Sequence, residues 1–125
     1  MARLTQSEED YLEAIYMIDQ EKKVVRTKNI AKHLGIKLPS VTEAIKKLSK
    51  KNLTIYEKYG YIRLTKEGEK HAKEVFKKHQ ALFSFLTKVL GVKKEVALKE
   101  ACMMEHSLSA ETINKLIRFI KKYRR

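Results

Sequence analysis

The sequence is short of the residues that make crosslinks, sharp turns and membrane spans. One cysteine in 125 residues excludes an intramolecular disulfide framework. One proline and 4 glycines are too few for a β protein with many tight turns, so the composition favours helices. No apolar run approaches the length of a membrane span, and the N-terminal residues lack the apolar core of a signal peptide. We expect a soluble, cytoplasmic protein without a membrane partner.

What the chain does have is a core and a large excess of positive charge. Hydrophobic residues make up 43% of it, enough for a packed interior. The 28 Lys and Arg outnumber the 15 Asp and Glu, giving a net charge of +13, which favours a polyanionic partner such as nucleic acid. The alternative is a solvated, Lys-rich surface. Residues 1–64 carry +5 and residues 65–125 carry +8, so the excess is not confined to one part.

The first half of the chain predicts three helices. Ser7 and Asp10 are spaced as a capping box, and apolar residues with helical spacing follow until the charged stretch at residues 19–23. Thr27 is placed to cap a second helix that ends at Gly35, a residue suited to a left-handed C-cap. Pro39 fits the first turn of a third helix that runs to about residue 51.

Two short helices joined at Gly35 make a helix-turn-helix pattern, and its second helix is the candidate recognition helix. Residues 37–51 contain five lysines and one acid, although many amphipathic surface helices are rich in lysine. Hydroxyls near the start of such a helix suit base edges and phosphates, and lysines further along suit the DNA backbone.

A β-hairpin is predicted directly after the recognition helix. The β-prone stretches 53–58 and 61–64 flank a turn at Tyr59-Gly60, which together with the preceding helices gives a winged-helix arrangement. Lys58, Tyr59 and Tyr61 at the tip are suited to contact phosphate or the minor groove, unless the hairpin only covers the helical core. The residues that we expect to contact DNA are Thr27, Lys37, Pro39, Ser40, Thr42, Glu43, Lys46, Lys47, Lys58 and Tyr59.

The second half of the chain predicts three more helices. Thr65 caps a long helix to about residue 90, which Gly68 weakens only modestly and Gly91 ends. A fifth helix over residues 93–105 and a sixth opened by Ser109 follow. The fold class is therefore mainly α, with a winged helix-turn-helix DNA-binding domain at 1–64 and a second, helical domain at 65–125.

The chain's only cysteine belongs to a possible metal-binding pattern. In a helix, Cys102, Glu105 and His106 stand at i, i+3 and i+4 and share one face. A thiolate, a carboxylate and an imidazole on one face can ligate a transition metal. The alternative is a buried, structural or redox-sensing cysteine beside a surface glutamate and histidine.

The sequence resembles the diphtheria-toxin-repressor/manganese-regulator family of metal-dependent repressors. The resemblance covers nearly the whole chain in order, and it is closest to the short members that lack a C-terminal SH3-like domain. The stretches that carry it are residues 9–16 (EDYLEAIY), 27–31 (TKNIA), 39–42 (PSVT) with Leu48, 62–68 (IRLTKEG), His79, and 105–109 (EHSLS).

The resemblance implies the metal ligands residue by residue. They are two acids of the first helix, a histidine of the fourth and the cluster of the fifth, namely Asp10, Glu13, His79, Cys102, Glu105 and His106. The iron-type branch carries cysteine at the position of Cys102, and the manganese-type branch carries glutamate there. Phe83 and Leu98 replace ligands of an ancillary site, which is therefore not expected. We expect a divalent transition metal, Fe(II) first and Mn(II) next.

Two residues of the carried-over set have simpler interpretations: Asp10 fits a helix-capping acid, and His79 fits a surface histidine among lysines. Whether Glu13 ligates the metal stays open.

The resemblance implies a homodimer that represses genes of metal homeostasis, with residues 65–125 as its helical metal-binding and dimerisation domain. Metal would orient its winged helices for a palindromic operator, and the apolar residues around Phe83, Phe85 and Leu86 together with the sixth helix would form the dimer interface. Three alternatives remain: a metal-independent winged-helix regulator, an enzyme, and a DNA-binding protein without sequence specificity. The chain lacks His-Glu-x-x-His and a glycine-rich phosphate loop, so we expect no enzyme and no small-molecule substrate.

Overall fold

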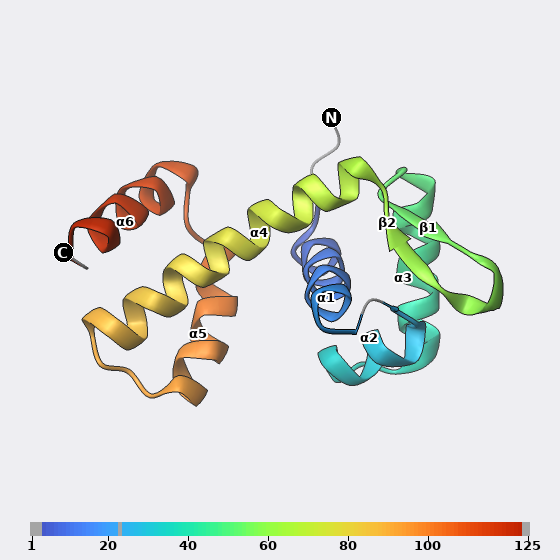
Figure 1. Ribbon diagram of the computed structural model, residues 1–125, viewed down its shortest axis with the longest axis horizontal. Helices are drawn as coiled ribbons and strands as arrows, with labels where there is room; N and C mark the ends of the chain where they lie inside the picture. Colours follow the sequence, from blue (N-terminus) through green and yellow to red (C-terminus); the bar gives the residue numbers. More distant parts are fainter. Residues whose placement is uncertain (1–3, 23, 124–125) are drawn as a thin grey trace. The chain divides into compact units, whose positions relative to one another are not determined.

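The computed structural model describes residues 4–22 and 24–123 and forms two compact units, residues 1–74 and 75–125. Unit 1 contains α1 (Gln6–Lys22), α2 (Thr27–Leu34), α3 (Leu38–Lys50), β1 (Thr54–Tyr56) and β2 (Ile62–Leu64) (Figure 1). The long helix α4 (Lys66–Ser84) passes through the boundary. Unit 2 continues with η2 (Phe85–Val89), α5 (Lys94–Glu105) and α6 (Ala110–Tyr123). Among the described residues, no helix is long and apolar enough to cross a membrane.

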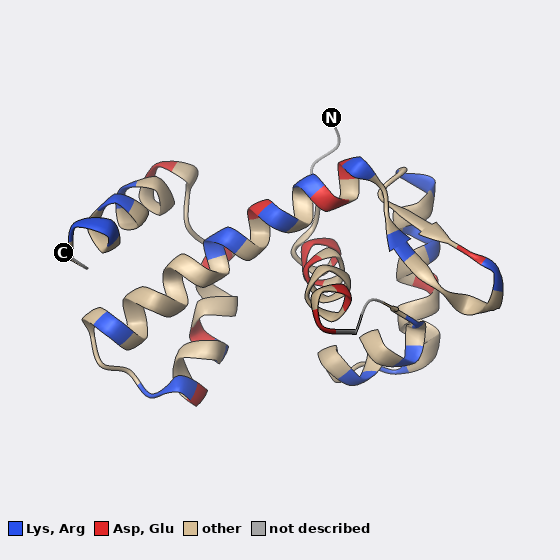
Figure 2. Ribbon diagram, viewed as in Figure 1, with Lys and Arg blue, Asp and Glu red and all other residues tan. Residues whose placement is uncertain are grey.

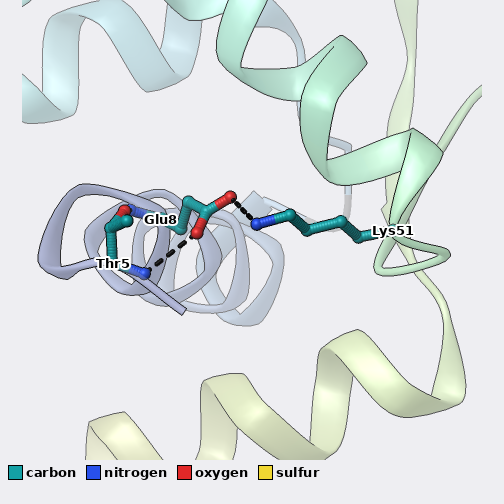
Figure 3. Close-up of polar contacts among 3 residues, drawn as sticks. All are labelled: Thr5, Glu8 and Lys51. Atoms are coloured by element: carbon teal, nitrogen blue, oxygen red, sulfur yellow. Dashed lines mark hydrogen bonds and ion pairs between the residues drawn. The ribbon is translucent and has the colours of Figure 1, made fainter. Parts of the chain in front are cut away.

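The start of α1 is fixed by a capping box that begins two residues earlier than the sequence predicted. The Thr5 hydroxyl accepts a hydrogen bond from the Glu8 backbone N–H (3.1 Å), and the Glu8 carboxylate accepts one from the Thr5 N–H (2.9 Å). Lys51, just after α3, donates to the other Glu8 oxygen and ties the ends of the two helices together (Figure 3). The predicted box at Ser7 and Asp10 was therefore wrong, and Asp10 is not needed as a capping acid.

The helix-turn-helix geometry is confirmed, with one cap reassigned. Gly35 ends α2 in the left-handed conformation at φ 67°, and Pro39 lies in the first turn of α3. The N-cap of α2 is Arg26 rather than Thr27, because the Asn29 side chain accepts a hydrogen bond from the Arg26 N–H (3.0 Å). Thr27 is instead the first residue of the helix.

The hairpin pairs β1 and β2 antiparallel, with Ile55 opposite Arg63, around a short helical turn, η1 (Lys58–Gly60). A bridge between Arg26 and Tyr61 adds the segment before α2 to its edge. The Thr54 hydroxyl donates to the backbone carbonyl of Ile45 in α3 (3.2 Å), which anchors the hairpin on the recognition helix. Helix-turn-helix and hairpin share one buried core formed by α1, α2, α3 and the strands, so unit 1 is a winged helix.

Gly68 has a structural role that the sequence did not reveal. Thr65 caps α4 as predicted, because its hydroxyl accepts a hydrogen bond from the Gly68 N–H (3.0 Å). A Cβ on Gly68 would lie 1.9 Å from the Leu53 carbonyl oxygen, at the entry to β1. The first turn of α4 can therefore lie against the hairpin only if residue 68 is glycine.

Unit 2 is built around a smaller apolar cluster formed by Leu82, Leu86, Ala97, Ala101 and Ile113. The predicted helix to residue 90 is interrupted, since α4 gives way to the π-helical turn η2, and Gly91 ends the segment at φ 74°. Leu86 is only 5% exposed, so it belongs to this core and not to the predicted dimer interface.

Candidate metal centre and nucleic-acid interface

Three side chains at the end of α5 converge as their spacing predicted. Cys102, Glu105 and His106 each offer one ligand atom, and these atoms lie within 4.8 Å of one another. Glu105 is the last residue of α5, and His106 is its C-cap, still in a right-handed helical conformation. The cysteine is half-buried, and the side chains of Glu105 and His106 are 1% and 5% exposed.

The Glu105 carboxylate lies between two imidazoles. One oxygen is 3.4 Å from Nε2 of His106, and the other is 3.4 Å from Nδ1 of His79, which extends from α4. The His79 side chain is 12% exposed, so the alternative of a surface histidine is wrong. Neither Glu105 oxygen accepts a hydrogen bond from the residues that the structure describes.

A buried carboxylate without a hydrogen bond is costly, and such groups in proteins are normally paired or bound to a metal. The donors gathered here are a thiolate, a carboxylate and two imidazoles, which together suit Mn(II), Fe(II) and Zn(II). The residues of unit 2 therefore fit a divalent transition metal by their chemistry and by the position of Glu105.

Asp10 and Glu13 lie in unit 1, one helical turn apart on α1. Glu13 is 6% exposed and Asp10 is half-buried. Because Thr5 and Glu8 form the cap of this helix, Asp10 has no capping function. The participation of Asp10 and Glu13 in a metal site with the residues of unit 2 stays a prediction.

The predicted DNA-contacting residues of α3 form an exposed, mainly basic face. Figure 2 shows lysines and arginines along α2 and α3 and at the hairpin turn. Thr42 is half-buried, and its hydroxyl donates to the Leu38 carbonyl within the helix (3.2 Å), which leaves only acceptor capacity. The exposed members are Lys37, Pro39, Ser40, Glu43, Lys46 and Lys47.

At the hairpin turn, Lys58 is exposed and Tyr59 is 85% exposed in a left-handed conformation. Tyr61, directly after the turn, contacts Arg26: its hydroxyl accepts a hydrogen bond from the guanidinium (3.0 Å), whose carbon lies 4.7 Å from the ring centroid. A contact of Tyr61 with DNA stays a prediction. Arg26 thus supports the wing from the segment before α2. This role of Arg26 was not predicted, and the only local signal for it is a short β-prone stretch at residues 24–26.

Two family models match this chain along nearly its whole length. Residues 3–62 match the N-terminal DNA-binding domain of the iron-dependent repressors, and residues 65–125 match the metal-binding and dimerisation domain of the same family. The chain belongs to the iron-dependent repressor family. This confirms the resemblance drawn from the sequence and the fold class, and it makes the chain a metal-dependent, DNA-binding transcriptional regulator. The metal-independent alternative is not favoured.

Comparison with individual proteins also finds transcriptional regulators. An uncharacterized HTH-type transcriptional regulator of Methanocaldococcus jannaschii is 39% identical over 122 residues, which are 97% of this chain and 98% of that protein. The HTH-type transcriptional regulator MntR of Bacillus subtilis is 38% identical over 112 residues, which are 90% of this chain and 78% of that protein. These relatives bear the names of transcriptional regulators and not of enzymes.

Solved structures give the same fold. The structure of T. acidophilum IdeR superposes with a TM-score of 0.84 at 27% identity, over 97% of this chain and 56% of that one. The manganese regulator SloR superposes with a TM-score of 0.81 at 30% identity, over 94% of this chain and 55% of that one. The chain thus spans about half the length of the chains in these two solved structures.

Proposed function

We propose that this chain represses genes of metal homeostasis when its metal ligands, divided between the two units, are joined by a divalent cation. The unit 2 ligands are Cys102, Glu105 and His106, with His79 beside Glu105. The observation that carries the proposal is the buried Glu105 carboxylate, whose two oxygens face two imidazoles without accepting a hydrogen bond. The unit 1 ligands are Asp10 and Glu13, and they rest on membership of the family and on their common face of α1.

Ligands on α1 would couple the metal to DNA binding. Within unit 1, α1 packs against α2, α3 and β2 and contributes Leu12 and Ile15 to their common core. A metal bound to side chains of α1 would therefore fix the position of the whole winged helix, because the close-packed core makes α1 move together with the rest of unit 1. Metal affinity and DNA affinity must then increase each other by the same factor.

Family membership supports a divalent metal, and the choice of one metal ion over another rests on Cys102. We propose Fe(II) as the physiological ion and Mn(II) as the next best, since a thiolate shifts preference away from manganese. Relatives named for manganese, such as the regulator SloR, have the same fold. Anaerobic competition titrations on the wild type and on Cys102→Glu test the assignment. An unchanged Fe/Mn preference in the variant would show that Cys102 is not the selector.

The chain would act as a homodimer on palindromic double-stranded DNA. Residues 65–125 match a dimerisation domain, and helix α6 leaves Phe119 and Tyr123 about half exposed. The Phe119 ring lies between those of Phe85 and Tyr123. A two-fold dimer places two recognition helices in successive major grooves. Sedimentation with metal present should give a dimer at micromolar concentration, and a monomer there would contradict the proposal.

The central test is operator affinity with and without metal. Binding to genomic DNA fragments is measured in chelator and in Fe(II) or Mn(II), with Glu100→Gln as a control for an exposed acid on the same helix as the cluster. Wild type and control should bind more tightly with metal, whereas His106→Ala should not respond. Equal affinity of the wild type in both conditions would refute the proposed function.

A further inference from the structure

Glu43 is the one acid on the recognition helix. The other charged residues of α3 (Leu38–Lys50) are Lys46, Lys47 and Lys50. Glu43 is exposed on the same face as Lys47, and it forms no ion pair or hydrogen bond with any residue that the structure describes. Its charge is thus neither buried nor neutralised by pairing within the winged helix.

An exposed carboxylate on a DNA-facing helix works against binding. It is repelled by the phosphates that the lysines attract, and nothing in unit 1 needs it for packing. Its position, the sixth residue of α3, lies in the N-terminal half of the helix, where side chains reach base edges. There a carboxylate is favourable only if it meets a hydrogen-bond donor in the major groove.

The major groove offers two such donors, the N4 amine of cytosine and the N6 amine of adenine. On adenine, the N6 amine lies beside the N7 acceptor, which would repel the second carboxylate oxygen. On cytosine, no acceptor of the same base adjoins the N4 amine. We propose that Glu43 selects a C·G base pair in each operator half-site by accepting a hydrogen bond from N4 of the cytosine. This inference rests on the proposed DNA-binding function.

The neighbouring side chains support this role of Glu43. Ser40 and Lys47 lie one turn before and after Glu43 and line the same hollow as it does, beside Thr5 and Ser7 at the start of α1. Lys47 can bind a phosphate and so position the helix on the DNA, while Glu43 contacts the base and selects the sequence.

Selection from a randomised DNA duplex with the full metal-loaded chain tests the inference. The wild type should enrich one cytosine per half-site and bind about 10-fold more weakly when that pair is replaced. Glu43→Gln should prefer adenine there, because an amide donates to N7 and accepts from N6, and Glu43→Ala should lose the preference. Glu21→Gln, which removes an exposed acid from α1, controls for the loss of one negative charge and should leave the selected sequence unchanged.

The outcomes separate the inference from the function on which it rests. The same selected sequence in wild type, Glu43→Gln and Glu43→Ala would overturn the role of Glu43 while leaving the DNA-binding function intact. A uniform gain in affinity for all duplexes in the Glu43 variants would also overturn it, since that result reports only charge. No enriched sequence for the metal-loaded wild type would overturn both the function and the inference.

Discussion

Glu105→Gln should abolish most of the thermal stabilisation that metal gives, without destabilising the metal-free protein. The substitution keeps the shape of a side chain that is 1% exposed between His79 and His106. It removes the charge that ligates a cation. In the metal-free chain, the neutral amide is easier to bury than a carboxylate that accepts no hydrogen bond, so stability should stay equal or rise.

The size of the effect follows from linkage. Metal at 100 times its dissociation constant stabilises the folded chain by about 2.7 kcal/mol. Loss of an outer-shell partner of a metal ligand costs about 10- to 100-fold in affinity, so loss of a direct carboxylate ligand should cost at least about 100-fold. The remaining stabilisation is then about 0.4 kcal/mol. At about 3–6 °C per kcal/mol, the metal-induced rise in Tm should shrink by about 7–14 °C.

Thermal unfolding followed by circular dichroism, with and without Mn(II), measures both quantities. Glu100→Gln, on the exposed side of α5, should behave as the wild type. If Glu105 has only a structural role, the opposite pattern would appear: the metal-free variant would be destabilised and its metal-induced shift preserved. That result would refute the assignment of Glu105 as a ligand.

Two further predictions concern the winged helix. Gly68→Ala should lower the urea midpoint by an amount equivalent to about 1–3 kcal/mol, because its Cβ would meet the Leu53 carbonyl oxygen, although alanine is the better helix former; a more stable variant would contradict this packing. Partial burial raises the pKa of Glu8, but hydrogen bonds from Lys51 and Thr5 outweigh it and leave the pKa below the ordinary 4.5. Because the pKa of Glu8 is lower in the folded than in the unfolded chain, its charge stabilises the folded protein at pH values above the unfolded pKa. Glu8→Gln should therefore lower the free energy of unfolding by about 0.5–1 kcal/mol at pH 7. The cost should vanish as the pH falls from 4.5 through the lowered pKa of folded Glu8, and an equal cost at pH 3 would contradict a role for the Glu8 charge.

Local rules predicted most of the fold and the local part of the site. Gly35, Pro39 and the hairpin turn are determined by backbone preferences that act over a few residues, and they were confirmed. The convergence of Cys102, Glu105 and His106 follows from helical spacing alone.

Features that depend on tertiary packing were missed or misplaced. Thr5 with Glu8 and Ser7 with Asp10 both have the spacing of a capping box, and the first is used where Lys51 also reaches the carboxylate. The need for glycine at residue 68 depends on how closely α4 approaches the hairpin, which no local pattern reveals.

The reassigned cap bears directly on how this chain would sense metal. A helix that begins with its own capping box at Thr5 and Glu8 is stable without help from Asp10. The same helix carries the core residues Leu12 and Ile15 that hold α2 and α3, while Asp10 and Glu13 lie one turn apart. Folding and sensing therefore use different residues of α1. A metal bound through α1 would change the orientation of the winged helix without changing its fold, so loss of the metal would weaken operator binding and leave unit 1 intact.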